Sequence, residues 1–130
     1  MMIVLAVAAG GAIGAVGRYF VIGWAETLLA AWLGAGFSYG TMVVNVIGSF
    51  LLGVLVEVMA LSLSISPEIR SLLVVGVLSG FTTFSAFSLD TVLLLERGEI
   101  GRALVYVLLS VGLSIGALFL GLRLIRLALS

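Results

Sequence analysis

The sequence predicts an all-α membrane protein with four transmembrane helices and a break in the third. Of its 130 residues, 63% are hydrophobic and 9% are charged, whereas soluble domains carry about 25% charged residues. The mean hydropathy of +1.42 places the chain among integral membrane proteins. So small a chain cannot enclose a wide vestibule alone, and we therefore expect an oligomer. Cysteine and histidine are absent, which excludes disulfides, thiolate or imidazole metal sites and histidine acid–base catalysis.

The apolar residues fall into four runs within a single transmembrane domain, residues 1–130. We expect the spans at residues 3–22, 40–61, 69–95 and 102–122. No lysine or arginine precedes the first run, so we interpret it as a retained span and not as a signal peptide. The connection at 23–39 has room for a short surface helix at 25–33. Before the third span, Ser66 is a predicted N-cap, with Pro67 at the first helical position.

The third run contains an unusual stretch at residues 80–88, Gly-Phe-Thr-Thr-Phe-Ser-Ala-Phe-Ser, with four hydroxyls and three phenyl rings in eight consecutive residues. Irregular or polar backbone persists at membrane depth only where protein buries it or where it lines a cavity. We therefore predict a helix break near Ser79–Thr83 and a pore lining in a small ion channel. Such a break frees carbonyls for a cation and turns a half-helix N-terminus toward an anion. The alternative is an intact helix whose hydroxyls bond back to carbonyls four residues earlier.

Polar side chains recur at helical spacing on two other spans. One stripe holds Thr41, Asn45 and Ser49, and the other holds Tyr106, Ser110 and Ser114. All six are neutral and can donate hydrogen bonds. A lining of this kind suits a small hydrated anion or polar solute, because it replaces water without trapping the ion.

Four residues carry two interpretations each. The amide of Asn45 makes either an interhelical hydrogen bond or a donor to an anion, and the sequence leaves both open. Phe84 and Phe87 share a helix face, where phenyl rings usually pack against lipid or core but where their positive edges can also contact an anion. Arg18 is read first as a snorkelling anchor near an interface, and alternatively as a positive group at the mouth of an anion pathway.

The arginines give no preferred orientation in the membrane. Four spans place Arg70, Arg123 and Arg126 on the side of the termini, and Arg18, Arg97 and Arg102 on the other side. Because three arginines lie on each side, the positive-inside rule favours neither orientation. We therefore predict insertion in both orientations, which allows an antiparallel, dual-topology homodimer paired about an axis in the membrane plane.

Three other functional classes compete with a channel. A small proton-coupled multidrug exporter of the four-span, dual-topology type would be expected to carry a glutamate in its first span, and residues 3–22 hold no acidic residue. A structural subunit would use its polar residues only to join helices. An enzyme is not expected, because no nucleophile has a nearby base and no metal-ligand cluster stands out. The composition gives no sign of nucleic-acid binding.

Three motifs make the chain resemble the Fluc (CrcB-type) fluoride channels over nearly its whole length. They are Gly10-Gly11-x-x-Gly14-Ala15-x-x-Arg18-Tyr19, Gly40-Thr41-x-x-x-Asn45-x-x-Gly48-x-Phe50-x-x-Gly53 and Gly80-x-Thr82-Thr83-Phe84-Ser85-x-Phe87-Ser88. The third motif is the most specific. The resemblance implies a passive fluoride-selective channel that exports fluoride from the cytoplasm across the inner (plasma) membrane and relieves its toxicity. It also implies a dual-topology homodimer with two antiparallel pores.

The resemblance assigns roles to particular residues. It implies that Phe84 and Phe87 line the pores and that Asn45 donates a hydrogen bond there. It places Arg18 in a vestibule. The polar lining that it implies also includes Thr41, Tyr106, Ser110 and Ser114.

The resemblance further implies a structural Na⁺ at the dimer interface, held by the backbone carbonyls of Ser79 and Thr82. Ser79 stands where the family often has the first of two glycines, which puts the geometry of the break in question. The partners implied are fluoride, an inverted copy of the chain and the lipid bilayer.

Overall fold

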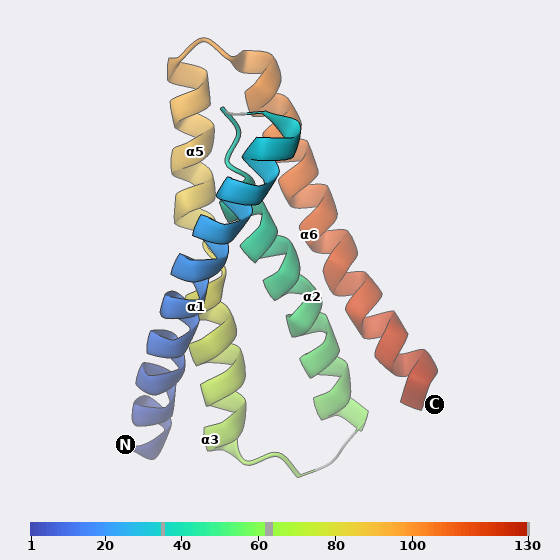
Figure 1. The fold of residues 1–130 in the computed structure, drawn as a ribbon. Helices are drawn as coiled ribbons and strands as arrows, with labels where there is room; N and C mark the ends of the chain where they lie inside the picture. Colours follow the sequence, from blue (N-terminus) through green and yellow to red (C-terminus); the bar gives the residue numbers. More distant parts are fainter. Residues whose placement is uncertain (35, 62–63, 130) are drawn as a thin grey trace.

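The computed structural model describes residues 1–34, 36–61 and 64–129. All regular secondary structure within these residues is helical, and four segments are long and apolar enough to cross a membrane. The elements are α1 (Met2–Leu33), α2 (Tyr39–Leu61), α3 (Pro67–Arg70), η1 (Ser71–Leu78), α4 (Ser79–Phe81), α5 (Phe84–Glu96) and α6 (Ile100–Leu129). Both termini lie at one end of the bundle, and the α5–α6 connection lies at the other (Figure 1). The predicted four-span architecture with a broken third span is confirmed.

The first helix is longer than the expected span. It does not end near residue 22 but continues to Leu33, so the residues expected to form a separate surface helix at 25–33 belong to α1. Neither glycine nor proline interrupts the sequence between Gly23 and Gly34. The helix ends where Gly34 takes a positive φ of 93°, a conformation that glycine adopts without steric cost. The last helix likewise runs past residue 122, to Leu129.

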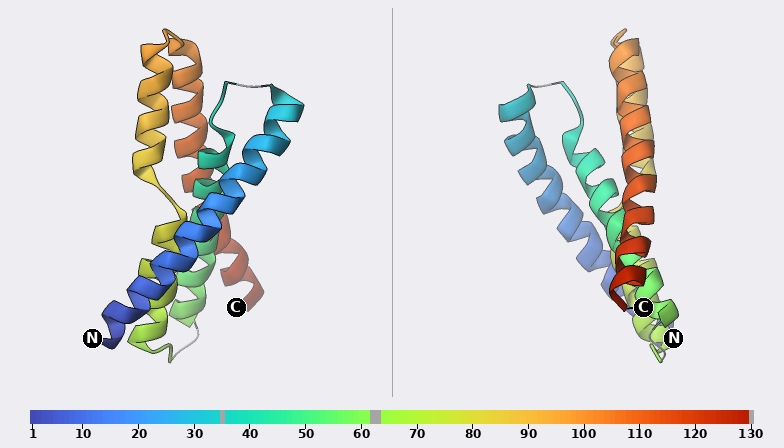
Figure 2. Two further views of the ribbon diagram at one scale, coloured as in Figure 1. Left: turned by 60° about the vertical axis from the view of Figure 1, so that its left-hand side comes forward. Right: turned by 90° about the vertical axis from the view of Figure 1, so that its right-hand side faces the viewer.

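The third span changes its helical form along its length. It begins as predicted, with Pro67 at the first helical position and the Ser66 hydroxyl accepting a hydrogen bond from the Ile69 N–H at 3.2 Å. The residues of η1 form a π-helix, a wide helix that is frequent at functional sites. Helix α4 then stops at Phe81 and α5 begins at Phe84. Figure 2 shows the extended link between them in its left view.

Glycines let α1 cross the third span at close range. A Cβ atom built on Gly14 would overlap the carbonyl oxygen of Val77 and would lie 2.9 Å from the backbone nitrogen of Phe81. Lipid tails are as apolar as the side chains of a membrane helix, so the hydrophobic effect does not drive such helices together. They associate largely through close packing of this kind. The crossing of α1 therefore holds in place the residues of the third span that come just before the break.

We expect Gly14→Ala to destabilise the fold, because the added methyl group would push α1 away from Val77. Overpacking of this kind costs about 1–3 kcal/mol. Thermal unfolding in detergent, followed by circular dichroism, measures the effect. Gly23→Ala is the matched control on the same helix, since no atom lies within 4 Å of its built Cβ. Equal unfolding temperatures for the two variants would contradict this account of the crossing.

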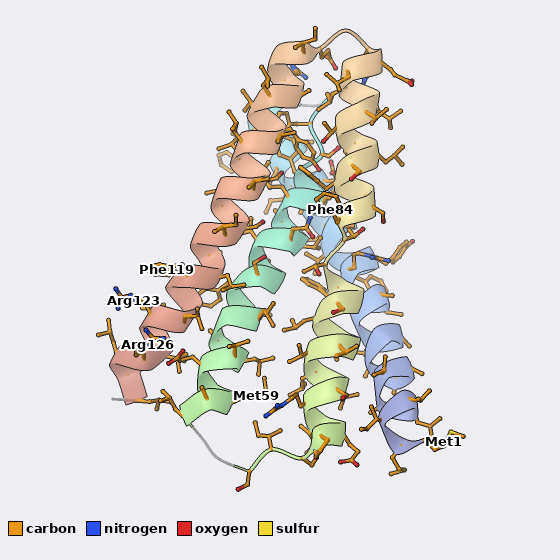
Figure 3. The ribbon with its side chains drawn as sticks, turned by 180° about the vertical axis from the view of Figure 1, so that it is seen from behind. Met1, Met59, Phe84, Phe119, Arg123 and Arg126 are labelled. Carbon is orange, nitrogen blue, oxygen red and sulfur yellow. The ribbon has the colours of Figure 1, made fainter. Side chains whose placement is uncertain are left out.

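An ion pair joins α2 to α6 near the end that holds the termini. Arg126 donates two hydrogen bonds to the carboxylate of Glu57, from Nε to Oε1 at 3.0 Å and from Nη2 to Oε2 at 3.1 Å. Glu57 is buried and Arg126 is exposed. Figure 3 shows Arg126 together with Arg123 on this last part of α6. A buried carboxylate needs such a partner, since an unpaired charge is costly away from water.

The positions of the arginines differ from expectation at one residue. Arg18 lies near the middle of α1 and not at the end of a span. The two ends of the bundle therefore carry Arg70, Arg123 and Arg126 on one side and Arg97 and Arg102 on the other. A difference of one positive charge gives a weak bias, so dual topology stays a prediction.

Candidate functional site

The helix break leaves two residues in extended conformation. Thr82 has φ −87° and ψ 159°, and Thr83 has φ −153° and ψ 116°. Thr83 is the N-cap of α5, because its Oγ1 accepts a hydrogen bond from the Ala86 N–H at 3.1 Å. The predicted break near Ser79–Thr83 is thus present, and α5 is a capped half-helix whose N-terminus lies within the bundle.

Asn45 on α2 holds the break in place. Its Nδ2 donates to the Thr83 carbonyl at 3.1 Å, and its Oδ1 accepts from the Thr83 N–H at 2.8 Å. The amide thereby gives a partner to the Thr83 N–H, which an uninterrupted helix would bond to the Ser79 carbonyl. The interhelical interpretation of Asn45 therefore describes this chain. Because Nδ2 carries two N–H groups, the other can still serve an anion, and that role stays a prediction.

A cavity of about 390 Å³ adjoins the break, between α2, the third span and α6. Its lining consists of Asn45, Gly48, Ser49, Leu52, Val74, Leu78, Ser79, Thr82, Thr83, Phe84, Phe87, Ser110, Val111, Ser114 and Ile115. No charged side chain is among these residues. The hydroxyl of Ser110 is buried and has no hydrogen-bond partner in the described part of the chain. A buried hydroxyl without a partner is costly, so this atom is available to a bound ion or water.

Two phenyl rings form the wall of this cavity at the start of α5. The ring centroids of Phe84 and Phe87 lie 5.5 Å apart. Phe84 is 77% exposed in the single chain, whereas Phe87 is buried, and Figure 3 shows Phe84 next to the break. Phe87 in turn contacts the ring of Tyr106, with centroids 5.4 Å apart. The hydroxyl of Tyr106 donates to Asp90 Oδ2 at 3.0 Å.

The cavity brings together most of the residues that the sequence singled out. Asn45, Phe84, Phe87, Ser110 and Ser114 line it, as do Ser79 and Thr82. Tyr106 and Thr41 are buried and do not line it. Arg18 lies on α1 and is also absent from the lining.

The carbonyls expected to bind a cation have lost their regular helical partners. In an uninterrupted α-helix the Thr83 N–H would bond to the Ser79 carbonyl and the Ala86 N–H to that of Thr82. Both donors are instead bound to side chains, at Asn45 Oδ1 and Thr83 Oγ1. Ser79 has ordinary helical angles, φ −69° and ψ −31°, so a serine fits where the family often has glycine. Such carbonyls are suitable ligands for a hard cation.

Known proteins resemble this chain over its full length. Residues 5–122 match the model of a family described as CrcB-like protein, Camphor Resistance (CrcB). The chain belongs to the CrcB family. A relative from Rhodospirillum centenum is 53% identical over 131 residues, covering 100% of both chains. Relatives from Rhizobium etli and Agrobacterium fabrum are 50% and 52% identical, each covering 97% of this chain and 98% of its own. All three carry the name Fluoride-specific ion channel FluC.

Three polar contacts of this CrcB-family chain were not predicted from the sequence. They are the Glu57–Arg126 pair, the Tyr106–Asp90 hydrogen bond and the bond from the Gly40 N–H to Glu26 Oε1 at 2.8 Å. The last of these places a carboxylate at the N-terminus of α2, where it is stabilised by the helix dipole. The extension of α1 to Leu33 also means that the first membrane helix carries one acidic residue, Glu26.

Proposed function

We propose that this protein is a fluoride-specific ion channel that carries fluoride out of the cytoplasm by passive electrodiffusion across the inner membrane. Relatives about half identical over the whole chain bear the name of such a channel. The observation that carries the proposal within the chain is the buried, unpartnered hydroxyl of Ser110 in an uncharged cavity. A hydroxyl in that position can replace one water of a strongly hydrated anion.

The other groups of the cavity support the same role. Ser114 and the second N–H of Asn45 supply further donors, and the rings of Phe84 and Phe87 supply positive edges. Without a fixed positive charge in the lining, an anion is bound weakly and can leave quickly. In this proposal Thr41 and Tyr106 continue the pathway beyond Phe87, and Arg18 acts from the vestibule.

We further propose that the active form is an antiparallel homodimer with a structural Na⁺. The carbonyls of Ser79 and Thr82 give two oxygens per chain, and hard cations generally take about six or more oxygen ligands. A second, inverted copy would double the number of carbonyls. The copy would also cover apolar surface, since only 11–22% of the residues in the apolar windows are buried within one chain. Flux measured with N-methylglucamine in place of Na⁺ should fall, and equal flux would remove the cation from the proposal.

The proton-coupled exporter is the less favoured function. Its key glutamate would have to be Glu26, but that carboxylate accepts a hydrogen bond from the Gly40 N–H and does not line the cavity at the break. Nor do the named relatives suggest drug export.

Growth of a fluoride-sensitive bacterium tests the proposal in cells. A strain that lacks its own fluoride exporter should grow in acidic medium containing fluoride when it expresses this chain. Resistance to lipophilic cations should not change. Resistance to such cations without resistance to fluoride would favour the exporter instead.

A further inference from the structure

A second cavity lies beyond the aromatic side chains that bound the first. It measures about 280 Å³ and is lined by Leu33, Phe37, Tyr39, Gly101, Arg102 and Val105. These residues come from the end of α1, the connection to α2 with the first residue of α2, and the first turns of α6. The cavity therefore sits at the end of the bundle opposite the termini (Figure 1).

An aromatic series connects the two cavities. Phe87 lines the first cavity and contacts Tyr106, while Tyr106 contacts Phe37 edge to face at 5.4 Å between centroids. Phe37 lines the second cavity and lies 5.6 Å from the ring of Tyr39. Tyr106 is fully buried in this series. One aromatic residue thus separates the rings that line the two cavities.

Arg102 supplies the charge of the second cavity. It is the only ionisable side chain among the described lining residues apart from the phenol of Tyr39. Its Nη1 donates to the Gly36 carbonyl at 3.4 Å and lies 3.9 Å from Glu99 Oε1. Both contacts are long, and a guanidinium carries five N–H donors. The side chain is 51% exposed, so it can present donors to an ion arriving from water.

Arg102 is the only charged side chain in the described lining of this cavity, although Glu26, Asp90, Glu96 and Glu99 outnumber the two arginines at this end of the bundle. Glu99 also contacts Arg97, at 3.5 Å, so two arginines share one carboxylate. The nearby carboxylates of Asp90 and Glu26 are bound to Tyr106 and to the Gly40 N–H. A positive group in a cleft raises the local concentration of anions and their rate of arrival.

We propose that Arg102, with Phe37 and Tyr39, forms an anion-recruiting mouth at the connection end of the pathway. The site takes a small hydrated anion such as fluoride and passes it toward Tyr106 and Phe87. Its long contacts and exposure keep binding weak, so the ion is concentrated at the mouth and not held there. This inference rests on the proposed channel function.

Flux measurements on Arg102→Gln at two ionic strengths test the proposal. Screening extends over about 30 Å at 0.01 M salt and about 10 Å at 0.1 M salt. The variant should lose about three- to fivefold in fluoride flux near 0.01 M, the size expected for one unit charge at contact distance in water. The loss should shrink as salt is raised, which a purely structural defect would not do. Arg102→Lys should keep most of the flux.

Arg97→Gln is the matched control. Arg97 precedes α6, contacts the same glutamate and is similarly exposed, but it does not line the cavity. Its removal should change the flux much less than removal of Arg102. Equal losses for Arg97→Gln and Arg102→Gln would show a diffuse surface charge and overturn the proposed mouth.

Chemical restoration of the charge gives a second readout on one folded protein. The chain has no cysteine, so Arg102→Cys introduces a single thiol. A cationic aminoethyl methanethiosulfonate should restore flux at low salt, and an anionic sulfonatoethyl reagent should lower it further. If both reagents change the flux alike, the effect is steric and the proposal fails. If the unmodified wild-type chain carries no fluoride, the proposed function fails instead.

Discussion

Fluoride flux should fall to the level of protein-free liposomes when Phe84 is replaced by isoleucine. Phe84 lines the cavity at the break and is 77% exposed in the single chain, so its ring faces the space where an anion would pass. Isoleucine keeps a similar apolar bulk but lacks the positive ring edge that can face an anion. The loss should therefore be one of conduction and not of folding. Fluoride-electrode recordings of efflux, with size-exclusion chromatography of the dimer, measure both quantities.

Phe119→Ile is the control for this substitution. Phe119 lies on α6 away from the cavity, is 60% exposed and has Arg123 over its ring at 5.3 Å from the centroid (Figure 3). Its replacement should leave flux unchanged. Normal flux through the Phe84→Ile protein would remove the ring from the pathway.

Replacement of Asn45 by aspartate should also abolish flux, for two separable reasons. A carboxylate would place negative charge beside the cavity, where it repels an anion. It would also lose the N–H that donates to the Thr83 carbonyl and would bring two acceptors face to face. The same efflux assay measures conduction, and thermal unfolding measures the damage to the break.

Asn45→Leu separates the charge from the lost hydrogen bonds. Leucine leaves the Thr83 N–H without the side-chain partner seen here, and a buried unsatisfied group costs about 1–3 kcal/mol. We expect both variants to unfold at lower temperature and only the aspartate variant to add an electrostatic block, which higher salt relieves in part. Wild-type flux through Asn45→Asp would contradict the placement of Asn45 at the pathway.

The sequence predicts the break well because its signals are local. A glycine followed by hydroxyls inside an apolar run marks the interruption, and Thr83 caps the helix that follows. Asn45 also stands out locally, as a single amide on an apolar helix. The partner of Asn45 cannot be predicted from local spacing, because Thr83 lies 38 residues away in the sequence. The choice between a helix-joining and an anion-binding amide therefore needed the fold.

Other features depend on contacts still more distant in sequence. Glu57 and Arg126 lie 69 residues apart, and nothing in the spacing of either helix pairs them. The contact of Phe37 with Tyr106 likewise joins a connection to a helix. The sequence predicts a first span that ends at residue 22, whereas α1 continues to Leu33 and ends where Gly34 takes a positive φ.

Anion efflux from liposomes that contain the purified protein decides whether this chain conducts fluoride selectively. Fluoride and chloride electrodes are read side by side after a potassium ionophore is added. The ionophore lets K⁺ leave with the anion, so that no membrane potential builds up to oppose the efflux. Liposomes that contain a fluoride-selective channel should lose fluoride rapidly and should lose no chloride. Retention of fluoride by liposomes that contain well-assembled protein would contradict the proposed function, and proton-driven transport of lipophilic cations would then be the activity to measure.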